Sequence, residues 1–136
     1  MTWFADLSPY TYRPDRGAEP WPDLPLVNVG WLDVAQPFPT GETPAGLVEA
    51  LAALAVTARA NQTRGCHFCN ICPTEELDWV THPKGSAEFR VLGDGVVYAA
   101  PELLVHYVAE HDYRPPAPFV DGALATAAGQ RLPGHG

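Results

Sequence analysis

Prolines limit where regular structure can form in this chain of 136 residues. Fifteen prolines and twelve glycines make up about a fifth of it, against a typical share of about 12%. Because proline removes a backbone donor and breaks helix interiors, the proline-rich regions before residue 45 and after Asp112 are predicted to be ordered loop. Aromatic residues alternate with the N-terminal prolines and are expected to cover the core rather than to bind a ligand: Trp3, Phe4, Tyr10 and Tyr12.

The stretch between these two regions carries most of the predicted regular elements. Residues 26–32 are apolar and β-branched, which indicates a strand. Residues 44–60 are predicted to form a helix, with Thr43 as its cap and Pro44 at its first position. Apolar residues recur there at helical spacing: Leu47, Val48, Leu51, Leu54 and Ala55.

The second half of the sequence predicts a hairpin followed by helices. Residues 88–92 and 96–100 flank Gly93-Asp94-Gly95, a turn sequence that suits two antiparallel strands. Pro101 is expected to open a second main helix over 101–111, and a weaker Ala-rich helix is expected over 118–128. The tail from Gly129 to the end is expected to be frayed. The predicted fold is therefore α+β: a small single domain with two main helices, a β-hairpin, a metal-stapled loop and much irregular structure.

The charge of the chain excludes two classes of binding partner. Sixteen acidic residues against eight Lys and Arg give a formal net charge of −8. Phosphate backbones and anionic membranes both need clustered basic side chains, so nucleic acid and membrane are not expected as partners. The sequence shows no signal-peptide pattern and no apolar run long enough to span a bilayer, which predicts a cytoplasmic protein.

All three cysteines fall within seven residues, at Cys66, Cys69 and Cys72, with His67 between the first two. A disulfide framework spreads an even number of cysteines along a chain, so this cluster indicates metal ligands or redox groups instead. Two thiolates in Cys-x-x-Cys spacing lie on one tight turn and can both bind a single tetrahedral ion.

Zinc, or a similar divalent ion, is the favoured interpretation of the cluster. Cys69 and Cys72 would form the knuckle, and His67, His106 or His111 would complete the site. On the predicted second helix, His111 shares an apolar face with Leu104 and Val108, whereas His106 lies on the side of two glutamates. This favours His111 as the distant ligand, although fraying of the helix end could bring either histidine to the metal.

Three alternatives remain open for the cysteines. Cys-x-x-Cys-x-x-Cys followed by Pro73 begins the bacterial ferredoxin pattern, which predicts iron or an iron–sulfur cluster, but no fourth cysteine is present. A redox or nucleophilic thiol pair would need a strand before it, and none is evident. The third alternative is three free thiols without a ligand.

The sequence leaves the role of a metal undecided. Four ligands are easily found, which favours a closed structural site, and the small acidic chain then suits a protein-binding or accessory module, such as an immunity-type protein. A metal-dependent enzyme with an open zinc or iron position is an alternative, as is an iron–sulfur electron-transfer or sensor protein. Catalysis would also need a general base, and nothing selects among the acidic candidates Glu75, Glu76, Glu102 and Glu110.

Several ordered motifs span nearly the whole chain. They are FADLSPYTY at 4–12, NVGWL at 28–32, RGCHFC at 64–69, YAAP at 98–101, and HYVAEHDYRPP at 106–116 followed by Phe119. Together they resemble an uncharacterised family of small bacterial proteins that is frequent in actinobacteria. The resemblance implies no activity. An aromatic residue commonly stands in that family at the position of Cys66, which implies a ligand set of His67, Cys69, Cys72 and a helix histidine.

Overall fold

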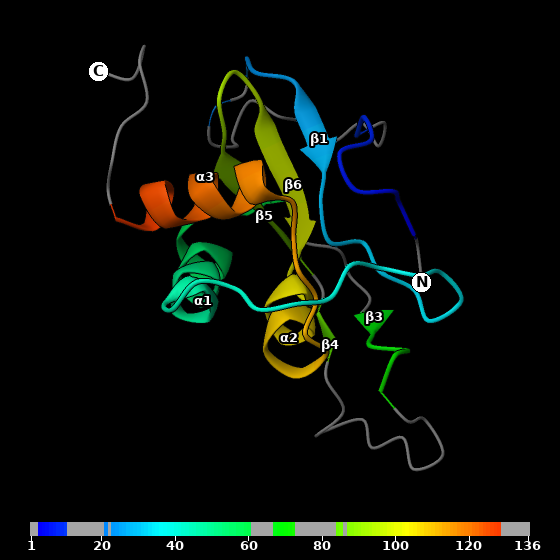
Figure 1. The fold of residues 1–136 in the computed structure, drawn as a ribbon. Coiled ribbons are helices and arrows are strands. Elements are labelled where there is room, and N and C mark those ends of the chain that lie inside the picture. The colour runs from blue at the N-terminus through cyan, green and yellow to red at the C-terminus, as the bar shows by residue number, and fades with distance from the viewer. Residues whose placement is uncertain are drawn as a thin grey trace.

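The structure is a computed structural model, and it describes residues 3–10, 21, 23–60, 67–72, 84–85 and 87–128. For residues 60, 67, 68 and 84 it describes the backbone alone. Tyr12 and the predicted tail from Gly129 lie outside these residues. Helices and strands are mixed along the chain in a single small domain, which confirms the predicted α+β class (Figure 1). Its strands are β1 (Leu26–Asn28), β2 (Arg59–Ala60), β3 (His67–Phe68), β4 (Lys84–Gly85), β5 (Glu88–Leu92) and β6 (Val97–Pro101), and its helices are α1 (Leu47–Thr57), α2 (Leu104–Glu110) and α3 (Ala117–Ala127).

The main sheet has four strands in the order β1-β6-β5-β2. The predicted hairpin is confirmed: β5 and β6 are antiparallel neighbours in register from Glu88↔Pro101 to Leu92↔Val97. Its turn closes where the Gly93 N–H donates to the Val96 carbonyl at 2.9 Å. β1 is parallel to β6, β2 is antiparallel to β5, and β3 and β4 form a separate two-stranded sheet.

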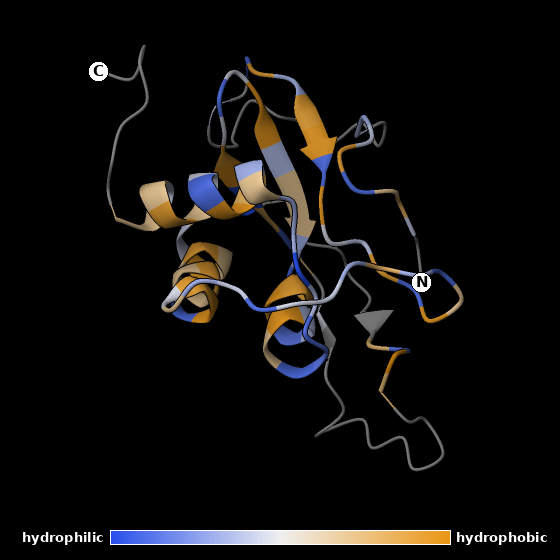
Figure 2. Ribbon diagram, in the orientation of Figure 1, coloured by the Kyte–Doolittle hydropathy of each residue, from blue (hydrophilic) through white to orange (hydrophobic). Residues whose placement is uncertain are grey.

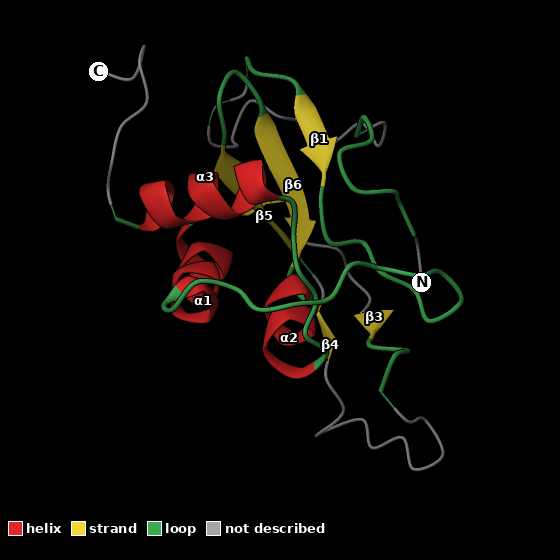
Figure 3. Cartoon of the chain, in the orientation of Figure 1, coloured by secondary structure: helices red, strands yellow, loops and turns green. Residues whose placement is uncertain are grey.

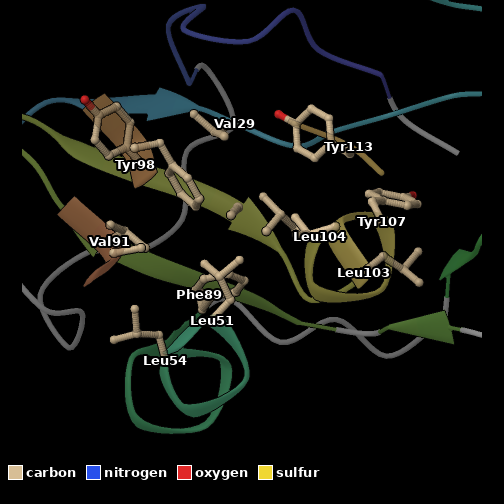
Figure 4. Close-up of a cluster of buried hydrophobic side chains, with 14 of the residues drawn as sticks. Val29, Leu51, Leu54, Phe89, Val91, Tyr98, Leu103, Leu104, Tyr107 and Tyr113 are labelled. Atoms are coloured by element: carbon tan, nitrogen blue, oxygen red, sulfur yellow. The ribbon is translucent and has the colours of Figure 1, made fainter. Parts of the chain in front are cut away.

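Helices α1 and α3 cover one face of the main sheet (Figure 1). Successive residues of a strand point to opposite faces, so Phe89 and Val91 of β5 share this face, and both are fully buried. Leu47, Leu51 and Leu54 of α1 recur at helical spacing and pack into the same cluster, as the spacing predicted. Figure 4 shows Leu51 and Leu54 in this cluster beside Phe89 and Val91. Figure 2 shows mostly apolar residues along α1 and β1. Burial of this face is the main stabilising contribution of the fold.

The opposite face of the sheet is covered by the N-terminal chain. Tyr10 packs there against a smaller apolar cluster of β1, β5 and β6. Its hydroxyl donates to the Glu88 carboxylate, whose oxygens lie 3.0 and 3.1 Å away. Glu88 also accepts a 2.8 Å bond from the fully buried Arg90. Tyr10 thus covers the core as predicted, whereas Trp3 is 42% exposed.

The helices differ from the predicted ones at their ends: α1 stops at Thr57 rather than residue 60, because Arg59–Ala60 form β2 and pair with β5. α1 begins at Leu47 rather than residue 44 because Gly46 adopts a left-handed conformation, which leaves Pro44 in a preceding turn. α2 begins at Leu104, and Pro101 ends β6 instead of opening the helix. The third helix, predicted to be weak, has eleven residues, the same length as α1.

Long loops make up much of the described chain, including the whole connection from β1 to α1 (Figure 3). None of the helices in the described ranges has the length and apolar character needed to cross a bilayer.

Gly30 allows the chain after β1 to approach α2 closely. Its φ is +85°, and a Cβ there would overlap the side chain of the fully buried Leu104. Gly46 has nearly the same φ, +86°, but has nothing within 4 Å of an added Cβ. The two glycines therefore separate the cost of backbone strain from the cost of a steric overlap.

We predict that Gly30→Ala lowers the free energy of unfolding by roughly 2–5 kcal/mol, because left-handed strain and overpacking against Leu104 add together. The matched control Gly46→Ala carries only the strain, roughly 1–2 kcal/mol. Urea unfolding of the two variants and the wild type measures both values. Equal losses would show that the approach of Gly30 to Leu104 is not tight.

Candidate metal centre

The Cys-x-x-Cys segment directly follows β3. This strand pairs with β4 in antiparallel register, His67↔Gly85 and Phe68↔Lys84. Gly85 lies against Glu102, where a Cβ would come within 2.9 Å of the glutamate Cβ, so the small sheet sits close to the start of α2. Figure 1 shows β3 and β4 at the same end of the molecule as α2. Cys69 is fully buried there and Cys72 is half-buried.

The C-terminal end of α2 supplies two histidines. The helix ends at Glu110, His111 is its C-cap with φ −119°, and Asp112 takes a left-handed φ of +55°. The Tyr107 carbonyl accepts hydrogen bonds from the N–H groups of His111 at 3.0 Å and Tyr113 at 3.2 Å. Because the chain leaves the helix at His111, its ring turns toward the ring of His106, and the two ring centroids are 4.8 Å apart.

The four side chains bring their ligand atoms to one point. Cys72 Sγ lies 3.3 Å from Nε2 of His106 and 3.3 Å from Nε2 of His111. Cys69 Sγ lies 3.5 Å from Nε2 of His111, the two Nε2 atoms are 3.1 Å apart, and all four ligand atoms lie within 4.8 Å of one another. A tetrahedral zinc ion with ordinary bond lengths holds its ligand atoms about 3.3–3.8 Å apart. The donor set therefore fits a metal ion, with both imidazoles presenting Nε2.

The surroundings of the site oppose charge on a metal-free thiol. Burial, followed by the neighbouring Cys69, raises the pKa of the Cys72 thiol to about 11. Burial, followed by the negative charges of Cys69, Asp33 and Cys72, also raises the pKa of the Tyr107 phenol. A bound cation reverses this balance, because it stabilises thiolate ligands directly.

Four of the six predicted ligands meet in this cluster: Cys69, Cys72, His106 and His111. The helix-face argument favoured His111, and the structure adds His106, since the helix ends between the two. Cys66 lies outside the described residues, and of His67 only the backbone, within β3, is described. The described part of the chain thus brings together two thiols and two imidazoles, close enough to hold a metal ion.

Two residues next to the cluster, Asn70 and Asp33, were not among the residues predicted from the sequence. Asn70 stands between the two cysteines and donates from Nδ2 to Asp33 Oδ1 at 2.6 Å. Asp33 Oδ2 accepts from the Ala35 N–H at 2.9 Å. The bond from Ala35, followed by the bond from Asn70, lowers the pKa of the Asp33 carboxyl. The position of Asn70 between two candidate ligands was the only sequence signal for this contact.

Comparisons with known proteins identify a family for this chain but no activity. The model of a family described as a domain of unknown function (DUF7919) matches residues 2–124. No curated protein and no solved structure matches the chain. The match covers most of the sequence, including all four residues of the cluster. The chain therefore belongs to the DUF7919 family of domains of unknown function.

Proposed function

We propose that this is a zinc-binding protein in which Cys69, Cys72, His106 and His111 hold one structural ion. The observation that carries the proposal is the convergence of four ligand atoms within 4.8 Å from two segments more than thirty residues apart in the chain. Both imidazoles turn Nε2 toward the Cys72 sulfur, and His111 Nε2 also lies 3.5 Å from the Cys69 sulfur. One central cation satisfies all four donors at once.

The donor set favours zinc over other ions. Two thiolates and two imidazoles in tetrahedral arrangement are a common structural zinc set, whereas calcium and magnesium prefer oxygen ligands. An iron–sulfur cluster bound through three thiolates would require Cys66 as a third thiol. The cluster of two thiols and two histidines is complete without it.

The closed ligand set favours a structural role over a catalytic one. Four protein ligands fill a tetrahedral zinc ion, and a catalytic zinc keeps one position for water. The ion would tie the loop after β3 to α2, which stabilises a small fold that is rich in loops. We propose that the stapled domain acts in the bacterial cytoplasm as a protein-binding or accessory module. Its net charge of −8 suits a basic partner surface.

The ligand set can be tested by substitution. We expect purified wild-type protein to contain about one zinc per chain, and Cys72→Ser and His106→Ala to lose most of it, because each removes one of four ligands. Elemental analysis measures the metal, and cobalt substitution reports the ligands through its visible absorption. Loss of a ligand should also lower the melting temperature, since metal binding contributes directly to folding.

Cys66→Ser is the matched control for Cys72→Ser, because it removes another thiol of the same segment. It should retain the zinc and the cobalt spectrum. His67→Ala should retain them as well. Loss of metal from Cys66→Ser, together with iron, sulfide and a brown colour in anaerobically purified protein, would replace the zinc site with an iron–sulfur cluster. Wild-type protein that binds neither zinc nor cobalt would contradict the proposal.

Zinc affinity should rise with pH. Since the pKa of the Cys72 thiol is about 11, this thiol is protonated in metal-free protein across pH 6–8 and must lose its proton when zinc binds. Cys72 alone then makes the apparent association constant rise about tenfold per pH unit, and weaken by the same factor as pH falls. Competition with a chromophoric chelator at several pH values measures the slope. A slope near zero would show that the thiol enters the site without losing a proton.

A further inference from the structure

One loop is hydrogen-bonded to the chain beside both halves of the proposed ligand set. We call residues 33–41 the bridging loop. They lie in the connection between β1 and α1. At its start, Asp33 accepts from Asn70 Nδ2 at 2.6 Å, and the Val34 N–H donates to Asn70 Oδ1 at 3.1 Å. Both polar atoms of the Asn70 amide are therefore bound to the loop. Asn70 is the residue that directly follows the ligand Cys69.

The far end of the bridging loop holds the chain that directly follows His111. The Gly41 N–H donates to the Asp112 carbonyl at 3.0 Å, and the Arg114 N–H donates to the Pro39 carbonyl at 3.0 Å. Thr40 and Tyr113 form an antiparallel bridge between these bonds. Asp112 has the left-handed conformation that turns the chain out of α2 at His111. The same loop thus fixes the backbone next to Cys69 and the backbone next to His111.

We infer that Asp33 and Asn70 are positioning residues of the metal site, and that the bridging loop sets the geometry of both ligand pairs before the metal binds. The inference rests on the proposed metal-binding function. The Asp33 carboxylate also accepts a hydrogen bond from the Ala35 N–H within its own turn. This bond fixes the carboxylate at the place where the Asn70 amide donates to it. Partners that orient metal ligands commonly change affinity by 10–100-fold when they are lost.

The chemistry of the contact allows a reciprocal test. In Asn70→Asp two carboxylates meet where the 2.6 Å bond lies, so the contact breaks without a change in side-chain size. Adding Asp33→Asn to this variant restores all three bonds, with the amide donor now on residue 33 and the Val34 and Ala35 N–H groups still paired. The double variant has the net charge of the wild type.

Zinc dissociation constants are measured by chelator competition on the folded proteins. They should depend on whether the contact between residues 33 and 70 is intact, and not on the charge of residue 70. We expect Asn70→Asp to weaken binding about tenfold or more, and the double variant to return to within about threefold of the wild type, in line with the coupling expected for neighbouring residues. Charge alone predicts the opposite sign for the single variant, because a new carboxylate beside a cation strengthens binding. The cobalt spectrum of each variant should keep the absorption of the wild-type ligand set.

Three controls separate positioning from general effects. Ala52→Glu adds a carboxylate on the exposed side of α1, and Asp94→Asn removes one from the exposed hairpin turn. Gly46→Ala lowers stability away from the site. All three should bind zinc as the wild type does. Where Asn70→Asp does not fold, Asn70→Ala, which removes the amide without changing the charge, gives the single-variant value.

The outcomes are distinct. Weakened binding in the single variants with recovery in the double variant supports the inference. Unchanged or tighter binding in Asn70→Asp, or a double variant as weak as the single ones, overturns it while leaving the zinc site intact. Wild-type protein that binds no metal defeats the proposed function instead.

Discussion

Two histidines five residues apart can face one ion only if the helix that carries them ends between them. Along an uninterrupted α-helix such residues point roughly 140° apart, since each residue turns the helix by about 100°. In this protein α2 ends at Glu110, and the left-handed Asp112 turns the chain away. The ring of His111 then comes within 3.1 Å of that of His106, measured between the Nε2 atoms. The candidate metal centre therefore depends on this helix end, which brings His106 and His111 together.

The loops of the fold hold this helix end in place. Tyr113, which is fully buried two residues after His111, donates its hydroxyl to Asp6 of the N-terminal segment at 2.7 Å. Asp6 also accepts from the Gly30 N–H at 3.0 Å, and Gly30 is where the chain approaches α2. Burial raises the pKa of the Tyr113 phenol, with Asp6 adding to the effect, so the tyrosine stays a neutral donor. Segments that the sequence predicted as irregular loop thus perform a defined task, which is to fix one end of one helix.

The sequence predicted those elements whose signals are local. Apolar spacing predicted α1, and Gly93-Asp94-Gly95 predicted the hairpin, because both signals act through neighbouring residues. Pro101 was wrongly assigned to a helix. Its suitability for a helix start is a local preference, whereas its pairing with Glu88 depends on the neighbouring strand of the sheet. Pro44 was misplaced in the same way, because the left-handed conformation of Gly46 decides where α1 begins.

The same division applies to the candidate site. Cys-x-x-Cys spacing is local and identified the knuckle, whereas the choice between His106 and His111 depended on how α2 ends, which periodicity does not encode. Asn70 and Asp33 lie 37 positions apart, and only the fold brings them together. A structural zinc ion contributes roughly 10–16 kcal/mol of binding free energy, comparable to the 5–15 kcal/mol stability of a whole domain. An ion that joins the knuckle to α2 would therefore be coupled to the loops around it, because the contacts that position its ligands are the same ones that close the fold.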